Sequence, residues 1–297
     1  MQYKSRFFPT GVGPLLPADG AYYWLARRLR ALLVLMALLC VMPIGAQVSE
    51  DDATEPPVRK FKEAKTALWL NSYGNIRLSD RFSWIAQTHF RFLQTEETPF
   101  VGQIAQIYNR HAISYQASSK FRMSLGGVLR LNFNTDGVLP SERRAVPEWR
   151  IWHEYLFSQP LSRIKLYHRI RLEHRWSQDF ENGSKYIFRN RWRYMLKLKM
   201  PLNNRQCVPG TFYVSPEAEL IMQSGKMVVD SPMEDLRLHT SFGYVVNPQL
   251  TVASGLMYSM GQDLKYGGVY KQKWTARFHV YFTPDLRKPE ARFVEAH

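Results

Sequence analysis

The sequence predicts an all-β fold, an antiparallel up-and-down transmembrane β-barrel with a polar, Arg-rich lumen. Between Ser162 and Met200, basic side chains alternate with apolar or aromatic ones at nearly every second position. Successive side chains of a strand point to opposite faces, so each strand has one cationic and one apolar face. A pattern typical of export precedes the strands, and short turns alternate with longer polar loops. A membrane barrel places the apolar face in lipid, whereas a soluble β-sandwich, the alternative, would bury that face and leave the cations in water.

The N-terminal region has the pattern of a secretory signal peptide. The segment Arg27–Arg30 is basic, the segment Ala31–Met42 is apolar, and the small residues Gly45 and Ala46 follow. Charged, apolar and cleavage regions in this order predict cleavage after Ala46. A retained membrane anchor is disfavoured, because the apolar run is shorter than the roughly 20 residues of a spanning helix. We therefore assign residues 1–46 to a signal peptide with an upstream extension and residues 47–64 to a polar N-terminal segment.

The mature chain is strongly basic. The whole sequence has a net charge of +15, and removing residues 1–46 leaves 35 cationic and 24 anionic side chains, or +11. Nucleic acid ranks last among the partners, because the cations alternate within strands and do not form a patch or a tail. Cys40 leaves with the signal and Cys207 stands alone, so we expect no disulfide framework, no metal site of the CxxC kind and no cofactor.

Eleven strands can be placed along residues 65–282, which form the predicted barrel, and a charged tail follows at residues 283–297. The strands are expected near residues 66–78, 81–95, 102–117, 120–134, 148–159, 162–176, 185–200, 211–224, 234–247, 249–262 and 269–282. Bacterial single-chain barrels have an even number of strands. We therefore expect about 12 strands, with 10 as the alternative, and place the missing strand within Val58–Ala64 or within Phe100–Gln116.

Two neighbouring segments also resemble a known family. The run Arg169–Trp176 (RIRLEHRW), the run Arg189–Tyr194 (RNRWRY) and the turn Pro201–Leu202 resemble the outer-membrane barrel family known as domain of unknown function 2490. The resemblance extends from Trp69 to the last strand. It implies the outer membrane of a Gram-negative, Bacteroidetes-like bacterium, with outer-membrane lipid and lipopolysaccharide as surroundings and the barrel-assembly machinery as a partner during insertion. It implies no activity. The chain departs from the usual barrel pattern by continuing past Phe282 into its charged tail.

The candidate site is the charged lumen. Its basic ladder comprises Arg163, Lys165, Arg169, Arg171, Arg175, Arg189, Arg191, Arg193 and Lys197. Its carboxylate partners are Glu148, Glu154, Glu173, Glu217 and Glu219. In one interpretation the ladder lines a small passive channel for anions or other solutes. In the other the carboxylates pair with the cations and fill the lumen, giving a structural or assembly role. Cations outnumber carboxylates, which leaves some demand for water, small anionic solutes or another ligand.

A lipid-modifying barrel enzyme is a distant third possibility, and we expect no enzyme. Such a site needs a serine activated by a histidine, and the candidates are His153, His168 and His174 with Ser158 and Ser177. No pattern marks a nucleophile among them. His168 and His174 lie six residues apart on one strand, about 20 Å at 3.3 Å per residue, too far to share a metal ion. A scaffold role would use the loop of residues 135–147 as a contact surface.

Overall fold

The computed structural model describes residues 60–135, 143–225, 228, 231–262 and 268–287. The predicted signal peptide at residues 1–46, most of the polar segment at residues 47–64, and the tail beyond residue 287 lie outside the described residues. Part of the predicted contact loop, residues 136–142, does so too. No helix within the described ranges is long and apolar enough to cross a membrane.

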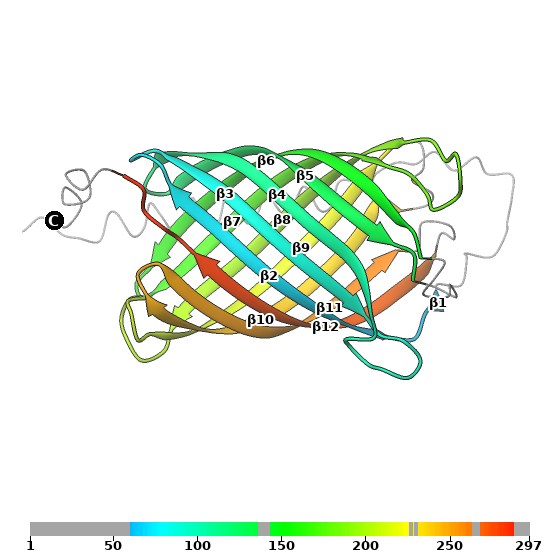
Figure 1. Ribbon diagram of the computed structural model, residues 1–297. Coiled ribbons are helices and arrows are strands. Elements are labelled where there is room, and N and C mark those ends of the chain that lie inside the picture. Colours follow the sequence, from blue (N-terminus) through cyan, green and yellow to red (C-terminus); the bar gives the residue numbers. More distant parts are fainter. Residues whose placement is uncertain (1–59, 136–142, 226–227, 229–230, 263–267, 288–297) are drawn as a thin grey trace, which may run out of the picture. The chain divides into compact units, whose positions relative to one another are not determined.

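Twelve strands form one sheet that closes on itself (Figure 1). They are β1 (Lys60–Phe61), β2 (Lys65–Arg77), β3 (Phe82–Leu93), β4 (Gln103–Ser118), β5 (Phe121–Phe133), β6 (Ala145–Leu161), β7 (Ile164–Ser177), β8 (Ile187–Pro201), β9 (Phe212–Ser224), β10 (Met233–Asn247), β11 (Leu250–Gln262) and β12 (Val269–Phe282). All eleven strands placed from the sequence are present, with ends within three residues of the expected ones. The all-β barrel of about 12 strands is therefore confirmed.

The closure of the barrel differs from an even-numbered ring. Each strand from β2 to β12 pairs antiparallel with the next, and β12 then pairs parallel with β2, from Lys273↔Lys65 to Phe282↔Gly74. The closed ring thus has 11 strands. With an odd number of up-and-down strands the first and last run in the same direction, so their pairing has to be parallel.

The twelfth strand lies inside the segment where the sequence placed it, but it is only two residues long. β1 pairs parallel with Val269 and Tyr270, on the same edge of β12 that β2 occupies farther along. Lys60 pairs with a residue 209 positions later in the chain, and Lys65 with one 208 positions later. The segment between β1 and β2 therefore contains one residue more than the stretch of β12 that it follows. β1 is therefore an interrupted extension of β2 and adds no new position to the ring.

The side chains divide between the two faces of the sheet as the alternation predicts. On β8, Arg191 is 7% exposed whereas its neighbour Trp192 is 52% exposed. On β7, Arg171 is 4% exposed and Ile170 is 40% exposed. Large apolar side chains cover the outside of every strand from β2 to β12, whereas the inside holds most of the buried charged and polar side chains together with small apolar clusters, for example around Ile85 and Trp152. The predicted Arg-rich interior is confirmed.

The two ends of the barrel carry different connections. At one end, the turn end, residues 78–81, 119–120, 162–163 and 248–249 make short turns, and residues 202–211 make a longer one. At the other, the loop end, the connections are residues 94–102, 134–144, 178–186, 225–232 and 263–268. β2 begins at the loop end, where Thr66 accepts a hydrogen bond from Phe100 N (2.9 Å). β12 finishes at the turn end, where Thr283 N donates to Gln249 O (2.8 Å).

Candidate functional site: the charged interior

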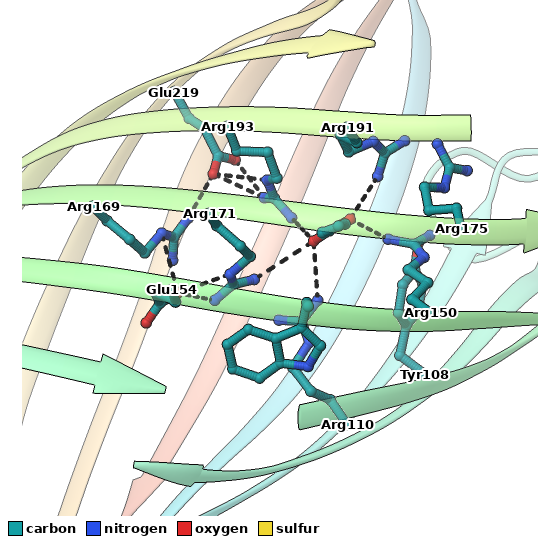
Figure 2. A network of polar contacts seen from close by, with 12 residues as sticks. Tyr108, Arg110, Arg150, Glu154, Arg169, Arg171, Arg175, Arg191, Arg193 and Glu219 are labelled. Carbon is teal, nitrogen blue, oxygen red and sulfur yellow. Dashed lines mark hydrogen bonds and ion pairs between the residues drawn. The ribbon is translucent and has the colours of Figure 1, made fainter. Parts of the chain in front are cut away.

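Glu173 lies at the centre of the interior charge network. Its carboxylate, 0% exposed, lies 2.8 Å from Arg150 Nη1 and 2.9 Å from Arg193 Nη1. Arg191, Arg110 and Arg171 approach it at 3.4, 3.8 and 3.9 Å. Five guanidinium groups from four strands, β4, β6, β7 and β8, thus converge on one buried carboxylate. Figure 2 shows the arginines meeting between these strands.

Other carboxylates extend the network in both directions. Glu148, also 0% exposed, lies 2.5 Å from Arg150, 2.7 Å from Arg130 and 3.0 Å from Arg175. Glu219 lies 2.5 Å from Arg169 and 2.7 Å from Arg193. Further ion pairs in the interior join Glu154 to Arg171 and Arg169, Glu234 to Arg191 and Arg175, Glu219 and Asp235 to Arg237, and Glu217 to Lys197.

The strand register explains why these charges meet. Each of five interior carboxylates lies directly opposite a cation on the neighbouring strand, and side chains in such positions are within reach of each other. The pairs are Glu148↔Arg130, Glu154↔Arg171, Glu173↔Arg191, Glu217↔Lys197 and Glu219↔Arg237. Like charges also face each other, for example Arg171↔Arg193. Their repulsion is offset because Glu173 contacts both of them.

Two chambers occupy the interior on either side of this network. The turn-end chamber has a volume of about 450 Å³ and reaches from Trp69 and Arg110 to Lys199 and Thr283. The loop-end chamber has a volume of about 200 Å³ and is lined by Arg130, Arg150, Glu234 and Lys273 among others. Six residues line both chambers and define what we call the waist: Trp69, Arg91, Tyr108, Arg110, Arg193 and Arg237.

At the waist, aromatic rings take the place of carboxylates beside Arg91. Its guanidinium carbon lies 3.7 Å from the Trp69 ring centroid and 4.1 Å from that of Tyr108, within the range of a cation–π contact. Arg91 Nη1 also donates hydrogen bonds to Tyr108 Oη (2.9 Å) and to Gln106 Oε1 (3.2 Å). Arg130 Nη1 donates to the same tyrosine oxygen (3.0 Å). At the waist, rings and guanidinium planes therefore pack together beside the ion pairs.

Most residues of the predicted ladder come together in the network. The structure joins Arg169, Arg171, Arg175, Arg191, Arg193 and Lys197 to the five predicted carboxylates, Glu148, Glu154, Glu173, Glu217 and Glu219. Arg189 is inside the barrel but donates to Ser177 Oγ (2.8 Å).

Besides Arg189, two predicted residues do not join the network. Arg163 is exposed in the β6–β7 turn and donates to the Pro201 carbonyl (2.6 Å), and Lys165 is exposed two residues farther along. Both lie at the turn end, where the interior meets solvent.

Several members of the network were not predicted from the sequence. Arg130 and Arg150 occupy inward-facing positions of the alternating pattern on β5 and β6, so the alternation of side chains along these strands could have predicted them. Arg110 belongs to β4, whose apolar pattern leaves the inward face ambiguous. Glu234 could not be found by parity, because the β9–β10 register shifts between Met233 and Asp235. That irregularity lets both Glu234 and Asp235 form ion pairs with interior arginines.

The serines and histidines of the enzyme hypothesis lie on different faces. Ser177 is buried in the interior beside Arg189. His174 faces outward, where its Nδ1 is 2.7 Å from Asn190 Oδ1 and its ring stacks on His153 at 5.9 Å. His168 Nδ1 is 2.8 Å from Tyr194 Oη. Among the described residues, no cluster of three or more His, Cys, Asp or Glu side chains is arranged to hold a metal ion.

Comparison with known proteins gives one match. A family model described as "Protein of unknown function (DUF2490)" matches residues 66–266, which run from the second residue of β2 into the β11–β12 connection. No curated protein and no solved structure matches the chain.

Proposed function

The chain belongs to the DUF2490 family, and from this premise we propose that it is an outer-membrane barrel of a Gram-negative bacterium whose lumen is closed at the waist. Its role is then structural, or that of an assembly partner for other outer-membrane components, and not that of an open pore. Strands of 12 to 17 residues in the ring exceed the 9 to 11 that a tilted strand needs to cross the hydrocarbon core. The apolar outer face and the predicted signal peptide support the same location.

The observation that carries the closed lumen is the coordination of Glu173. Its side chain is 0% exposed and lies within 4 Å of five guanidinium groups, so solvent does not reach this carboxylate, which supports a closed lumen. Buried ions are tolerated only when they are paired and hydrogen-bonded, and opening a path there would require several of these ion pairs to separate at once. Outer-membrane lipid, lipopolysaccharide and the barrel-assembly machinery are the surroundings and partners that this location implies.

Planar-bilayer recording from the purified chain beginning at residue 47 tests this proposal. We expect no stable conductance steps from a folded, heat-modifiable barrel. The double variant Arg91→Ala/Arg110→Ala removes two waist side chains and should produce steps, whereas Arg189→Ala, an interior arginine away from the waist, should stay silent. Regular steps from the unmodified barrel would refute the closed lumen. Density-gradient fractionation of cell envelopes tests the location separately.

One feature favours the second candidate, a small passive channel for anions. The two chambers share six lining residues, so the barrier between them is a single layer of side chains, four of them arginines. A side-chain rearrangement in that layer would join the chambers into a cationic path, which attracts anions and repels cations. In the same recordings this function requires steps that are anion-selective in the unmodified barrel and less selective in Arg110→Gln.

A further inference from the structure

We propose that the turn-end chamber is a binding site for a small organic anion with an aromatic or apolar body, held by Arg277, His239 and His279. This inference goes beyond the closed lumen and does not depend on it, because the chamber lies on the turn-end side of the waist. It requires only a folded barrel whose interior is arranged as described.

The chamber carries a large excess of positive charge. Ten Lys or Arg side chains line it, against three carboxylates, Glu154, Glu217 and Glu219. The carboxylates are already engaged by Arg169, Arg171, Arg193, Arg237 or Lys197. In the described part of the chain no carboxylate lies within ion-pair distance of three other lining cations, Arg122, Lys199 and Arg277. An anion in the chamber would supply the missing counter-charge.

Buried polar atoms without partners lie around Arg277. His239 is 5% exposed and His279 is 2% exposed, and in the described structure neither ring nitrogen of either residue has a hydrogen-bond partner. The same holds for Arg277 Nε, while Arg277 Nη1 reaches only the sulfur of Met257 at 3.7 Å. Unpaired buried donors are costly, and a native site that keeps several together calls for a ligand or ordered water.

The backbone register gathers these three residues into one subsite. Arg277 and His279 are two positions apart on the inward face of β12, and the His239 and His279 ring centroids are 5.5 Å apart. Gly255 on β11 lies opposite Arg277, and a Cβ atom there would come within 2.9 Å of His239 Nε2. The absence of a side chain at Gly255 therefore leaves room for the imidazole of His239.

The walls and the size indicate an organic anion. A volume of about 450 Å³ falls within the range of small-molecule pockets, whereas a bare inorganic anion would fill a small part of it. Tyr73 stacks on Tyr281 at 5.0 Å, and Tyr281 stacks on His279 at 5.8 Å, so aromatic rings adjoin the cationic subsite. Trp69 and Trp152 line the chamber toward the waist. A ligand with an acidic head and an apolar body would match both surfaces.

Isothermal titration of the refolded barrel in a neutral detergent tests the site, with phenyl phosphate as the probe. Benzyl alcohol serves as the uncharged control, and inorganic phosphate serves as the control that lacks an aromatic group. We expect saturable binding of phenyl phosphate that Arg277→Gln weakens about tenfold or more, because a charge-assisted hydrogen bond is lost. Arg189→Gln removes the same charge from an interior position outside both chambers, and it should change the affinity less than about twofold.

A second variant keeps the test decisive if Arg277→Gln does not fold. Lys199 is a lining cation near the turn end and contacts the Tyr213 ring at 4.1 Å, so Lys199→Gln should fold and weaken phenyl phosphate binding. No saturable binding by the folded barrel would overturn the proposal, as would equal weakening by Arg189→Gln. Inorganic phosphate binding as tightly as phenyl phosphate would overturn the organic part of it. None of these outcomes bears on the conductance of the barrel, so the two proposals fail independently.

Discussion

At the scale of single residues, Glu173 is the carboxylate on which the interior depends most. Its neighbours Arg150, Arg191 and Arg193 are each 10% exposed or less at the side chain. If Glu173 were neutral, each would keep one other carboxylate, Glu148, Glu234 or Glu219, but all of them would lose the anion that they share. Removing one partner of a buried ion pair is far more damaging than replacing the whole pair, because the remaining charge stays buried and uncompensated.

We therefore expect Glu173→Gln to lower the free energy of unfolding by about 3–5 kcal/mol, the usual cost of breaking a buried ion pair. Urea titration of the barrel in lipid vesicles, followed by tryptophan fluorescence, measures this change. Glu217→Gln is the matched control, because Glu217 forms a single ion pair within the described structure, with Lys197 at 3.4 Å, and its side chain is 13% exposed. An equal decrease in the free energy of unfolding for the two variants would show that the five arginines around Glu173 make it no more important for stability than Glu217.

A second residue-scale prediction concerns Asp285, just after β12. Hydrogen bonds from the Arg287 side chain lower the pKa of this carboxyl from 3.8 to about 2. A depressed folded-state pKa means that the charged carboxylate stabilises the folded contact. That contribution is complete above about pH 4 and is lost as the pH falls toward 2.

The amide of Leu286, which donates to Arg77 O at 2.9 Å, reports on this contact. Its hydrogen-exchange protection factor should be constant from pH 8 to pH 5 and fall between pH 4 and pH 2. Asp285→Asn should reduce the protection at every pH, and Asp179→Asn, in a loop-end connection, should leave it unchanged. Protection in Asp285→Asn equal to that of the unmodified chain would contradict the role given to the carboxylate.

At the scale of elements, the alternating pattern predicts most of the barrel and fails at particular places for physical reasons. The alternation of side chains places Arg171, Arg191 and the residues two positions away from each of them inside, because strand geometry fixes a period of two. It fails at Glu234, where an irregular register turns two consecutive residues inward. It also gives no account of the waist, because the approach of Arg91 to Trp69 and Tyr108 depends on how β2, β3 and β4 curve.

The parallel direction of the β2–β12 pairing is the feature that an even-numbered barrel would lack, because its first and last strands pair antiparallel. Ser72 and Val280 are partners in the parallel register and both are exposed on the outer face. Adjacent strands are about 4.8 Å apart, close enough for a disulfide. In a Cys207→Ser background, Ser72→Cys/Val280→Cys should form a disulfide that keeps the denatured chain compact on gel electrophoresis. Ser72→Cys/Phe278→Cys, displaced by one partner on the same face, should link much less.

At the scale of the whole barrel, the odd number of strands places the start of β2 and the end of β12 at opposite ends. β2 begins beside the β3–β4 connection at the loop end, and Thr283 contacts the β10–β11 turn at the turn end. An even-numbered barrel would bring both to one end. The eleven strands placed from the sequence already give this odd number. The twelfth strand was expected because bacterial single-chain barrels have an even count, and β1 adds no position to the ring because it lies along the same edge of β12 as β2.

If the barrel lies in the outer membrane as proposed and its long loops face the outside of the cell, as in outer-membrane barrels generally, the end of β12 faces the periplasm. An epitope appended after residue 297 should then resist protease added to intact cells, whereas one inserted in the β7–β8 connection, within residues 178–186, should be cleaved. An epitope placed after residue 47 should be cleaved as well. Protection of that N-terminal epitope alongside the C-terminal one would contradict an 11-stranded ring in the membrane.

The parallel pairing of β2 and β12 also constrains the order of assembly. Their partners are 208 residues apart in the chain, so β2 is synthesised long before the strand that completes its hydrogen bonds. During that interval β2 presents an open edge of backbone donors and acceptors, which invites pairing with other chains. Closure of the ring waits for residues 273–282, and a chain cut short before them would keep two unsatisfied edges, one on β2 and one on β11. The unpaired edge of β2 therefore has to be shielded, by chaperones or assembly factors, until β12 has been synthesised.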